Sequence, residues 1–438
     1  IVFSNILDNS ENFDVFRYRN YYNGGGVAIG DINNDGWQDV FLTSNTGSNK
    51  LFLNEGNFTF KDISESAGLS GNKPWSTGAA LADINADGLL DIYVCNSGDI
   101  KGGQRENELF INNGDLTFTE AAADYGLDDK GFSTHACFFD YDGDGDLDAY
   151  ILNNSFRSVA SLGFKNLRNE RDPYGGDKLY RNDNGKFTDV SADAGIYGSV
   201  IGFGLGVTVG DVNGDNWPDI YVSNDFYERD YLYINKQDGT FSEEFTRRFD
   251  AGSHFSMGAD MADLNNDGWP EIYVTDMLPP DLERLKQTTD FVDFDQFILR
   301  YNNDYYNQFM HNTLQRNDEG FFLEEAYLSG VAATDWSWGA LLCDLDNNGY
   351  KDIFVSNGVY KDVTDQDFIS FLANEETQEA VLMGKEVDFS AFVDAMPSKK
   401  IPNYCFSNSG NWKFENKSAE WGLDLPSHSN GAAYADLD

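Results

Sequence analysis

A nine-residue acidic phrase recurs six times along the chain and is the feature best suited to chemistry. Its copies are DINNDGWQD (31–39), DINADGLLD (83–91), DYDGDGDLD (140–148), DVNGDNWPD (211–219), DLNNDGWPE (263–271) and DLDNNGYKD (344–352). Carboxylate or amide oxygens occupy positions one, three and five, glycine usually occupies position six, and a carboxylate occupies position nine. A row of oxygens around a tight turn can enclose a hard cation of the size of Ca²⁺.

The variation at position seven fits the same interpretation, because a residue that contributes only its backbone carbonyl can carry any side chain. Mg²⁺ would require a stricter octahedron and more water. The phrase contains no soft ligands, which disfavours Zn²⁺ and Cu²⁺. Alternatively, each phrase could be an acidic turn that is exposed to solvent and binds no metal. Without a cation, however, the carboxylates within each of the six turns would repel one another. We therefore expect about six Ca²⁺ sites, with a further site where a seventh copy begins at Asp436.

The predicted metal ligands share positions one, three, five, seven and nine of the phrase. They are Asp31, Asn33, Asp35, Trp37, Asp39, Asp83, Asn85, Asp87, Leu89, Asp91, Asp140, Asp142, Asp144, Asp146, Asp148, Asp211, Asn213, Asp215, Trp217, Asp219, Asp263, Asn265, Asp267, Trp269, Glu271, Asp344, Asp346, Asn348, Tyr350, Asp352, Asp436 and Asp438.

Two copies depart from the pattern. The fourth has Asn216 at position six, where asparagine tolerates the positive φ that a tight turn needs. The sixth has Asn348 at position five, and so we expect its site to bind a cation more weakly than the others.

The composition limits the possible partners. The chain has 438 residues with 30 Lys and Arg against 74 Asp and Glu, a net charge of −44. This charge disfavours nucleic acid and anionic membranes as main partners. The hydrophobic fraction of 41% is enough for a packed core, no apolar run is long enough to span a membrane, and four cysteines form no disulfide framework.

The context of each phrase predicts the elements that hold it. Small and apolar residues precede it, a β-branched and aromatic run such as DIYVSN follows it, and two further short runs with a turn come next. This pattern is typical of four short antiparallel strands per repeat, repeated at a period near 50 residues. We predict an all-β fold, a β-propeller of four-stranded antiparallel blades, with an array of β-sandwiches as the structural alternative.

The repeat count predicts seven blades in a single domain over residues 1–438. Six repeats are complete and a seventh has its first strand, so we expect the chain to continue beyond residue 438. The opening segment Ile1–Leu7 loosely resembles a fourth strand, and it could complete the last blade and close the ring.

The repeats resemble the FG-GAP/VCBS repeats of integrin α-subunit propellers, of the cartilage-acidic-protein-like family and of cell-surface proteins of the Bacteroidota. Phe203-Gly204 with Gly206-Val207 matches the phrase that names the repeat, and 23–27, 257–260 and 336–340 carry further similarity. The resemblance covers essentially the whole chain. It implies the fold and the metal, but no particular ligand.

The connection between the second and third strands varies most in length, and strand alternation places it on the face opposite the acidic loops. Insertions are expected near 154–177, 276–312 and 359–402, and the last two have apolar residues at helical spacing. We therefore predict helical insertions on one face. Because long loops on a rigid scaffold commonly carry binding sites, this face is the predicted binding face.

Aromatic residues recur eight positions before the acidic phrase and are expected at the mouth of the channel on that face. They form either packing between blades or a cup for a partner. By its resemblance to integrins, such a cup would receive a basic side chain. The predicted partner-binding residues are Trp75, Phe132, Phe203, Phe255, Trp336 and Trp338.

Few residues favour catalysis. The histidines His135, His254 and His428 precede first strands near the channel mouth, and Asp260 is an isolated carboxylate in a first strand. The sequence has no nucleophile elbow, phosphate loop or zinc pattern. Rim packing and hydrogen-bonded structural roles are the alternatives for these residues.

The sequence thus predicts a non-enzymatic, calcium-stabilised propeller that binds a protein or glycan partner through the face opposite the calcium loops, as a subunit of a surface assembly. The expected location is extracellular or at the cell surface, including the bacterial outer membrane with a lipid anchor. The alternative is a propeller-based enzyme, such as a polysaccharide lyase or a phosphoesterase.

Overall fold

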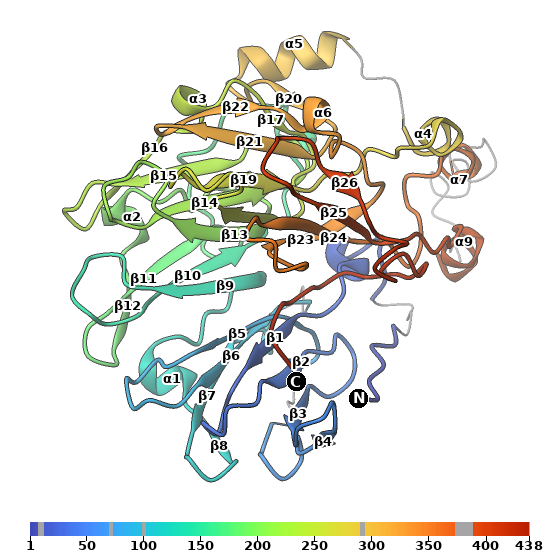
Figure 1. Ribbon diagram of the computed structural model, residues 1–438. Coiled ribbons are helices and arrows are strands. Elements are labelled where there is room, and N and C mark those ends of the chain that lie inside the picture. The colour runs from blue at the N-terminus through green and yellow to red at the C-terminus, as the bar shows by residue number, and fades with distance from the viewer. Residues whose placement is uncertain (8–12, 70–72, 99–101, 290–293, 373–388, 438) are drawn as a thin grey trace.

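The computed structural model describes residues 1–7, 13–69, 73–98, 102–289, 294–372 and 389–437 and contains six four-stranded antiparallel sheets (Figure 1). Blade 1 comprises β1 (Val27–Gly30), β2 (Asp39–Leu42), β3 (Lys50–Asn54) and β4 (Phe60–Asp62), and blade 2 comprises β5 (Ser76–Ala82), β6 (Asp91–Asn96), β7 (Glu108–Asn112) and β8 (Phe118–Glu120). Blade 3 comprises β9 (Ser133–Phe139), β10 (Asp148–Asn153), β11 (Lys178–Asn182) and β12 (Phe187–Asp189), and blade 4 comprises β13 (Gly204–Gly210), β14 (Asp219–Asn224), β15 (Tyr231–Asn235) and β16 (Phe241–Glu243). Blade 5 comprises β18 (Ala259–Ala262), β19 (Glu271–Val274), β21 (Thr313–Asp318) and β22 (Phe321–Glu324), and blade 6 comprises β23 (Ser337–Cys343), β24 (Asp352–Asn357), β25 (Tyr404–Ser407) and β26 (Glu415–Asn416).

The second strand of every blade begins at position nine of the acidic phrase, as in β6 and β14, and is buried along almost its whole length. Its β-branched and aromatic residues suit a strand that is covered on both faces. Neighbouring blades are joined at their inner strands, for example by Gly26 N donating to Thr77 O at 2.8 Å. The chain therefore folds as a β-propeller, as the repeats predict.

The α-helices of the described residues lie at the ends of blades and in the insertions. The short helices α1 (Ala122–Tyr125), α2 (Ser191–Ala194), α3 (Phe245–Arg248) and α6 (Ala326–Ser329) each follow a fourth strand. The predicted helical insertions are confirmed within the described residues. They contain α4 (Leu282–Thr288), α5 (Phe294–Asn302), α7 (Gln366–Leu372) and α9 (Phe389–Ala395), with the two-residue strands β17 (Gly252–Ser253) and β20 (Gln308–Phe309) beside them. No helix in the described part of the chain is long and apolar enough to cross a membrane.

The prediction of seven blades is wrong, because the described residues form six. The start of the seventh repeat contributes segment 429–437, which pairs with no strand of the described residues. This segment lies between blade 6 and blade 1: Ser429 N donates to Asn357 O at 2.8 Å, and Asn430 Nδ2 donates to Tyr22 O at 3.1 Å.

The opening segment does not complete a last blade, contrary to expectation. Residues 1–7 form no strand, and they lie against the β2–β3 connection of blade 1. There Asn5 Oδ1 accepts from Asn45 N at 3.0 Å, and Asn5 Nδ2 donates to Asn45 Oδ1 at 2.7 Å. Because these bonds use the polar groups of Asn5, they hold the segment at blade 1 instead of at the edge of blade 6.

An axial cavity of about 220 Å³ lies where the inner strands converge. The positions five residues before each acidic phrase all line it; they are Gly26, Gly78, His135, Gly206, Gly258, Gly339 and Gly431. Gly78 illustrates why small residues are needed, since a Cβ there would lie 2.4 Å from Thr134 O. Residues 430–432 thus take their place beside the six inner strands at the axis.

An asparagine lies at the end of each third strand, and in every blade except blade 3 it makes a bond beyond its own blade on the side of the acidic loops. The Nδ2 groups of Asn112, Asn235, Asn317 and Asn408 donate to the position-two carbonyl of the preceding blade's phrase, at 2.7–2.9 Å. Asn54 makes the corresponding contact, at 3.3 Å, with Leu437 O, which is position two of the seventh phrase. Segment 429–437 therefore occupies a blade position even though it forms no sheet.

This asparagine contact predicts a measurable difference between two alanine variants. Asn235 Nδ2 donates both to Tyr141 O of blade 3 and to Pro218 O of its own blade. Among the described residues, the side-chain amide nitrogen of Asn182 donates only within its own blade, to Leu147 O. Because a buried carbonyl left without a donor costs about 1–3 kcal/mol, Asn235→Ala should lower the free energy of unfolding by about 1 kcal/mol more than Asn182→Ala. Chemical denaturation of both variants tests this, and equal losses would contradict it.

Candidate functional site

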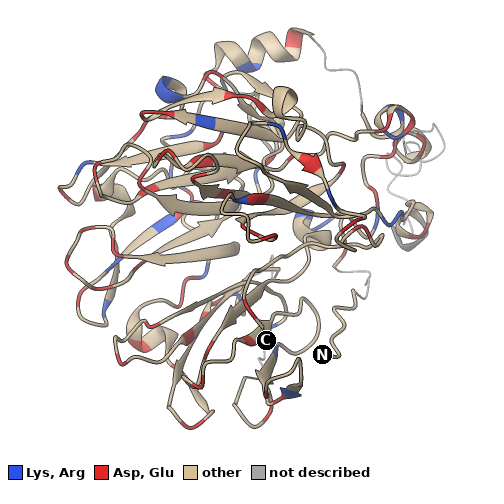
Figure 2. Cartoon of the chain, viewed as in Figure 1, with Lys and Arg blue, Asp and Glu red and all other residues tan. Residues whose placement is uncertain are grey.

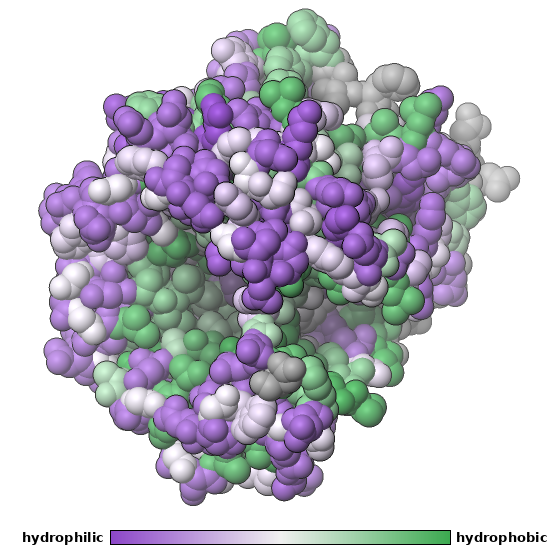
Figure 3. Space-filling model, viewed as in Figure 1, coloured by the Kyte–Doolittle hydropathy of each residue, from purple (hydrophilic) through white to green (hydrophobic). Residues whose placement is uncertain are grey.

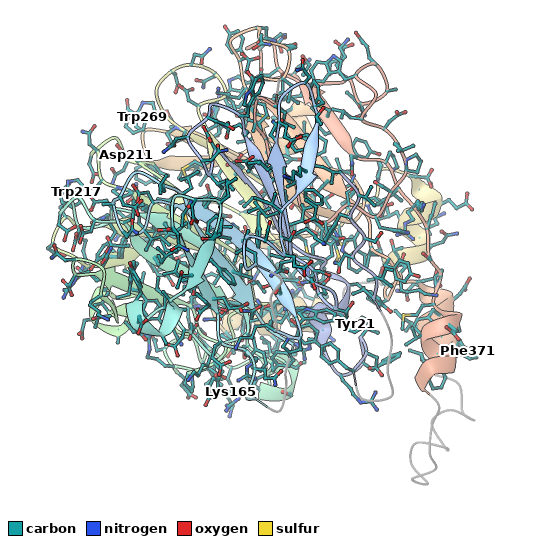
Figure 4. The ribbon with its side chains drawn as sticks, turned by 90° about the horizontal axis from the view of Figure 1, so that it is seen from below. Tyr21, Lys165, Asp211, Trp217, Trp269 and Phe371 are labelled. Carbon is teal, nitrogen blue, oxygen red and sulfur yellow. The ribbon has the colours of Figure 1, made fainter. Side chains whose placement is uncertain are left out.

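The acidic loops and the insertions lie on opposite faces, as strand alternation predicts. Asp211, Trp217 and Trp269 lie together on one side of the molecule, and Phe371 of α7 lies on the other (Figure 4). Many Asp and Glu residues lie in the connections between strands (Figure 2). One face therefore has six similar acidic loops, whereas the other has the long connections.

Each loop wraps its own backbone around its first carboxylate. In the first loop, Asp31 Oδ1 accepts from Asp35 N at 3.1 Å, and Asp31 Oδ2 accepts from Gly36 N at 2.7 Å. Gly36 has a φ of 93°, with no atom within 4 Å of a Cβ built there. Asn216, at the same position of the fourth loop, has a φ of 65°, which confirms that asparagine takes the turn conformation there.

The position-nine carboxylate is buried at the base of each loop and ties the loop to its blade. Asp39 is 1% exposed, and it accepts from Ile32 N at 3.0 Å through one oxygen and from Asn54 N at 2.7 Å through the other. Asp91, Asp148, Asp219 and Asp352 make the equivalent pair of bonds. This residue thus holds both the start of the loop and the end of the third strand.

Burial raises the pKa of these carboxyl groups, although backbone hydrogen bonds oppose the shift. The pKa is about 6 for Asp39 and Asp91, about 7 for Asp148 and Asp219, and about 8 for Glu271. The charges of the carboxylates at positions one and five raise the pKa further for Asp39, Asp91, Asp219 and Glu271. For Asp148 those at positions three and five, Asp142 and Asp144, do so. A bound cation would supply the opposite charge that this cluster lacks.

The donor set fits a hard cation. In two loops, three carboxylate groups each bring one oxygen within 4.8 Å of the others; the sets are Asp140, Asp142 and Asp148, and Asp344, Asp346 and Asp352. The Oδ1 atom of Asp142 is buried and has no hydrogen-bond partner among the described residues. The other four loops carry asparagine at position three, as where Asn33 Nδ2 donates to Asp35 Oδ2 at 2.9 Å. These oxygens could hold a metal ion.

The sixth loop differs from the others at Asn348. Its Nδ2 group donates to Asn408 O at 2.9 Å, and its Oδ1 atom accepts from Tyr350 N at 2.8 Å. Position five of this loop therefore offers one uncharged amide oxygen, which already accepts a backbone hydrogen bond. In the seventh phrase, Asp436 lies in the single segment 429–437, and Asp438 lies outside the described residues.

The side chains at position seven have a packing role that the sequence does not reveal. A Cβ built at Gly56 would lie 3.2 Å from the Trp37 ring, and one built at Gly410 would lie 2.5 Å from the Tyr350 ring. These glycines belong to the turns between the third and fourth strands. The variable residue at position seven thus packs the loop against a neighbouring turn.

The aromatic residues predicted as a binding rim lie on the insertion face but are mostly buried. Trp75 is 1% exposed, Phe132, Phe203, Trp336 and Trp338 are also buried, and Phe255 is half-buried. Arg105 of the same chain stacks over Phe132, with its guanidinium carbon 4.1 Å from the ring centroid. Packing, the alternative that the sequence left open, is the role that this geometry supports.

The N-terminal segment covers Trp75 of this rim. Tyr18 is fully buried, its ring lies 5.5 Å from that of Trp75 and 5.7 Å from that of Phe156, and its hydroxyl donates to Ser97 Oγ at 2.8 Å. Tyr21, in the 3₁₀ helix η1 (Arg19–Tyr22), lies 5.1 Å from Trp75 and on the side of Phe371 (Figure 4). A segment distant in sequence therefore occupies the place where a partner was expected.

The candidate catalytic groups are also engaged in the structure. Asp260 Oδ2 accepts from Leu342 N at 2.7 Å, which joins β18 to the inner strand of the next blade. His254 is buried beside Arg300, and burial together with this charge lowers its pKa to about 3. His135 is half-buried in the axial cavity, and His428 is half-buried at the rim.

The interpretation of the sequence missed the asparagines that end the third strands. Their signal is nonetheless present, because Asn54, Asn112, Asn182, Asn235, Asn317 and Asn408 recur two residues or fewer before a glycine-containing turn.

Comparisons with known proteins agree with the repeat pattern. The model of the FG-GAP-like repeat matches residues 31–94, 95–151, 169–222 and 211–274, more than half of the chain. Cartilage acidic protein 1 of Mus musculus is 29% identical over 233 residues, covering 52% of this chain and 33% of that protein. The protein of the same name from Xenopus tropicalis is 33% identical over 143 residues, covering 32% of this chain and 22% of that protein. The chain thus spans a third or less of each of these relatives.

Among solved structures, a lectin of Agrocybe aegerita that recognises non-reducing terminal N-acetylglucosamine is similar, with a TM-score of 0.42 and 16% identity. The match covers 88% of this chain and 77% of the lectin.

The buried carboxyl groups predict how stability depends on pH. Folding raises the pKa of Asp219 from 3.8 to about 7, so the folded state favours the protonated form. Its contribution to stability is fully present below the lower value and is lost as pH rises through the higher one. With a chelator present, the melting temperature should therefore fall between about pH 5 and about pH 8, and millimolar Ca²⁺ should remove or reverse this fall. K⁺ at equal ionic strength is the control. A melting temperature that rises over this range in chelator would contradict the prediction.

Proposed function

The chain belongs to the FG-GAP-like repeat family, and from this premise we propose that it is a calcium-stabilised, non-catalytic β-propeller that binds a protein or glycan partner through its insertion face. The partner would be reached outside the cell or at its surface, with the propeller as a subunit of a surface assembly. A lipid-anchored protein of a bacterial outer membrane is the form that we expect.

Calcium binding at the six acidic loops is supported by their oxygen-only ligands and by the uncompensated charge at each base. Six loops of one design imply about six ions. Loss of these ions would leave buried carboxylates close to other carboxylates, which costs stability. Because a cation that binds only the folded state stabilises it by mass action, the propeller would be most stable where free Ca²⁺ is plentiful.

The distribution of exposed apolar side chains is the observation that carries the binding proposal. The insertion helices expose Leu282 (63%), Phe294 (71%), Tyr301 (52%) and Phe371 (46%), whereas the rim aromatics are mostly buried. Figure 3 shows hydrophobic side chains at the surface over α5, at the top of the view. Exposed aromatic and aliphatic groups on one face commonly mark an interaction surface. The insertions are therefore better placed than the rim to meet a partner.

A non-catalytic role is supported by the state of the groups that could react. The carboxylate of Asp260 accepts two backbone hydrogen bonds, from Leu342 N and Met261 N. His254, whose pKa is lowered to about 3, is held neutral at physiological pH.

The loops should differ in how firmly they hold calcium. Asp142→Ala removes one of five carboxylates from the third loop, whereas Asp346→Ala removes one of three from the sixth, where Asn348 is already uncharged. We expect the Asp346→Ala protein to lose one equivalent of Ca²⁺ at a free concentration at which the Asp142→Ala protein retains its full complement. Calcium titration with native mass spectrometry measures the stoichiometry. The reverse order would show that carboxylate number does not set affinity here.

The binding face can be tested with matched surface variants. Phe294→Ser with Tyr301→Ser changes two exposed residues of α5, and Phe58→Ser changes an exposed residue of a turn on the loop face. Because buried aromatic anchors at interfaces are worth about 2 kcal/mol or more, the α5 variant should retain less than a tenth of the partner captured from native surface extracts. The Phe58 variant should capture as much as the unmodified chain. Equal capture by all three proteins would count against the insertion face, provided that their melting temperatures agree.

A further inference from the structure

A second cavity of about 220 Å³ opens on the insertion face between blades 3 and 4. Its wall comes from three separate parts of the chain: Arg19 of η1, Arg157 and Ser158 of the blade 3 insertion, and Phe203, Phe226 and Tyr227 of blade 4. Phe226 and Tyr227 follow β14 in the connection to β15. None of these residues belongs to an acidic loop, and only Phe203 was predicted as a rim residue.

The charge of this cavity is opposite to that of the protein as a whole. The chain has 74 acidic and 30 basic residues, and eight of its arginines pair with carboxylates; they are Arg17, Arg168, Arg181, Arg229, Arg247, Arg248, Arg284 and Arg316. Arg19 and Arg157 are exposed and form no salt bridge with any described residue. Two unpaired guanidinium groups at one cavity are therefore an exception on a surface where Lys and Arg are sparse (Figure 2).

A third arginine increases the positive charge nearby. The guanidinium carbon of Arg19 lies 5.2 Å from the Phe226 ring centroid, and that of Arg300, on α5, lies 5.3 Å from the Tyr227 ring centroid. Arg300 is 6% exposed and also forms no salt bridge with a described residue. The aromatic pair is thus bordered by guanidinium groups that form no salt bridge with a described residue. The carboxyl group that acts on Arg19 is Asp225, which is buried and whose pKa burial raises to about 7.

The aromatic wall is held in a strained but defined position. Phe226 has a φ of 64°, which is rare for an aromatic residue and typically costs about 1–3 kcal/mol. The buried side chain of Asp225 maintains it by accepting from Phe226 N at 2.5 Å, and the ring meets Phe203 edge-on at 4.8 Å. The ring is therefore fixed at the cavity before any ligand arrives, which lowers the entropic cost of binding.

We propose that this cavity binds one carboxylated sugar ring, such as a uronic acid unit, of an acidic glycan. The assignment rests on the proposed function and specifies a ligand for the same face. A planar guanidinium matches a carboxylate through two parallel hydrogen bonds. The aromatic rings offer apolar faces to the C–H groups of a pyranose, and Ser158 offers a hydroxyl to a neighbouring sugar oxygen. Inorganic phosphate would use the arginines and leave the aromatic wall without a partner.

A pair of ligands that differ only in the carboxylate tests the proposal. Binding of methyl glucuronide and methyl glucoside to the full chain would be measured by NMR titration in the presence of Ca²⁺. The glucuronide should bind at least about tenfold more tightly, since one well-placed charged contact is worth about that factor. Arg157→Ala should remove most of this preference. Arg181→Ala is the matched control, because Arg181 is a partly exposed arginine paired with Asp183 outside the cavity.

Each result decides the assignment. Equal binding of the two sugars, or unchanged glucuronide binding by Arg157→Ala, would overturn it. Tighter binding of a glutamate-rich peptide than of an oligouronate, competing at Arg157, would overturn the sugar as ligand. Thermal melts exclude unfolding of the variant as a cause. Arg157→Lys provides a second variant, which keeps the positive charge but loses the two parallel N–H donors of the guanidinium group. If glucuronide fails while the α5 variant still loses its partner, the proposed function stands and only this site falls.

Discussion

One buried carboxyl group in each blade, whose ionisation needs a compensating cation, is the constraint on which the rest of the architecture depends. The position-nine carboxylate of blade 4, Asp219, has no exposed surface and accepts from Val212 N and Asn235 N. Asn235 in turn donates to Tyr141 O of blade 3. The loop, the third strand and the neighbouring blade are therefore joined at a single carboxyl group. A cation in the loop would compensate this charge, so metal binding and the joining of blades are energetically linked.

The local parts of this arrangement can be predicted from the sequence, because residues that are close together along the chain determine them. The spacing of oxygens in the acidic phrase, the positive φ at Asn216 and the buried second strands each follow from fewer than ten consecutive residues. The helices of the long insertions follow from apolar spacing in the same way. The opposite placement of loops and insertions follows from strand alternation alone.

Features that depend on distant contacts could not be predicted in this way. The seventh repeat predicts a blade, yet segment 429–437 pairs with no strand among the described residues, and Leu437 O instead accepts from Asn54 of blade 1. The aromatic rim has the composition of a binding cup, but Tyr18 and Tyr21 cover Trp75 through contacts that no local pattern encodes. Likewise, the cavity beside Phe226 unites residues 19, 157 and 226, and its unpaired arginines become visible only when every salt bridge is known.

The geometry of blade 4 indicates how the two faces are connected. The strand β14 begins at Asp219, the base of the fourth acidic loop, and ends at Asn224, one residue before the Asp225 side chain that holds Phe226 at the second cavity. The strand β14 is buried along its whole length and pairs with β13 and β15, so a shift in its register would break contacts on both sides. Calcium would therefore act on ligand binding by keeping blade 4 folded and Phe226 in place, and not by switching the cavity between open and closed forms. A structural cation and an allosteric cation thus differ in their effect on ligand binding. For a structural cation, the apparent affinity of the whole sample falls with the folded fraction, whereas molecules that remain folded bind the ligand with unchanged affinity.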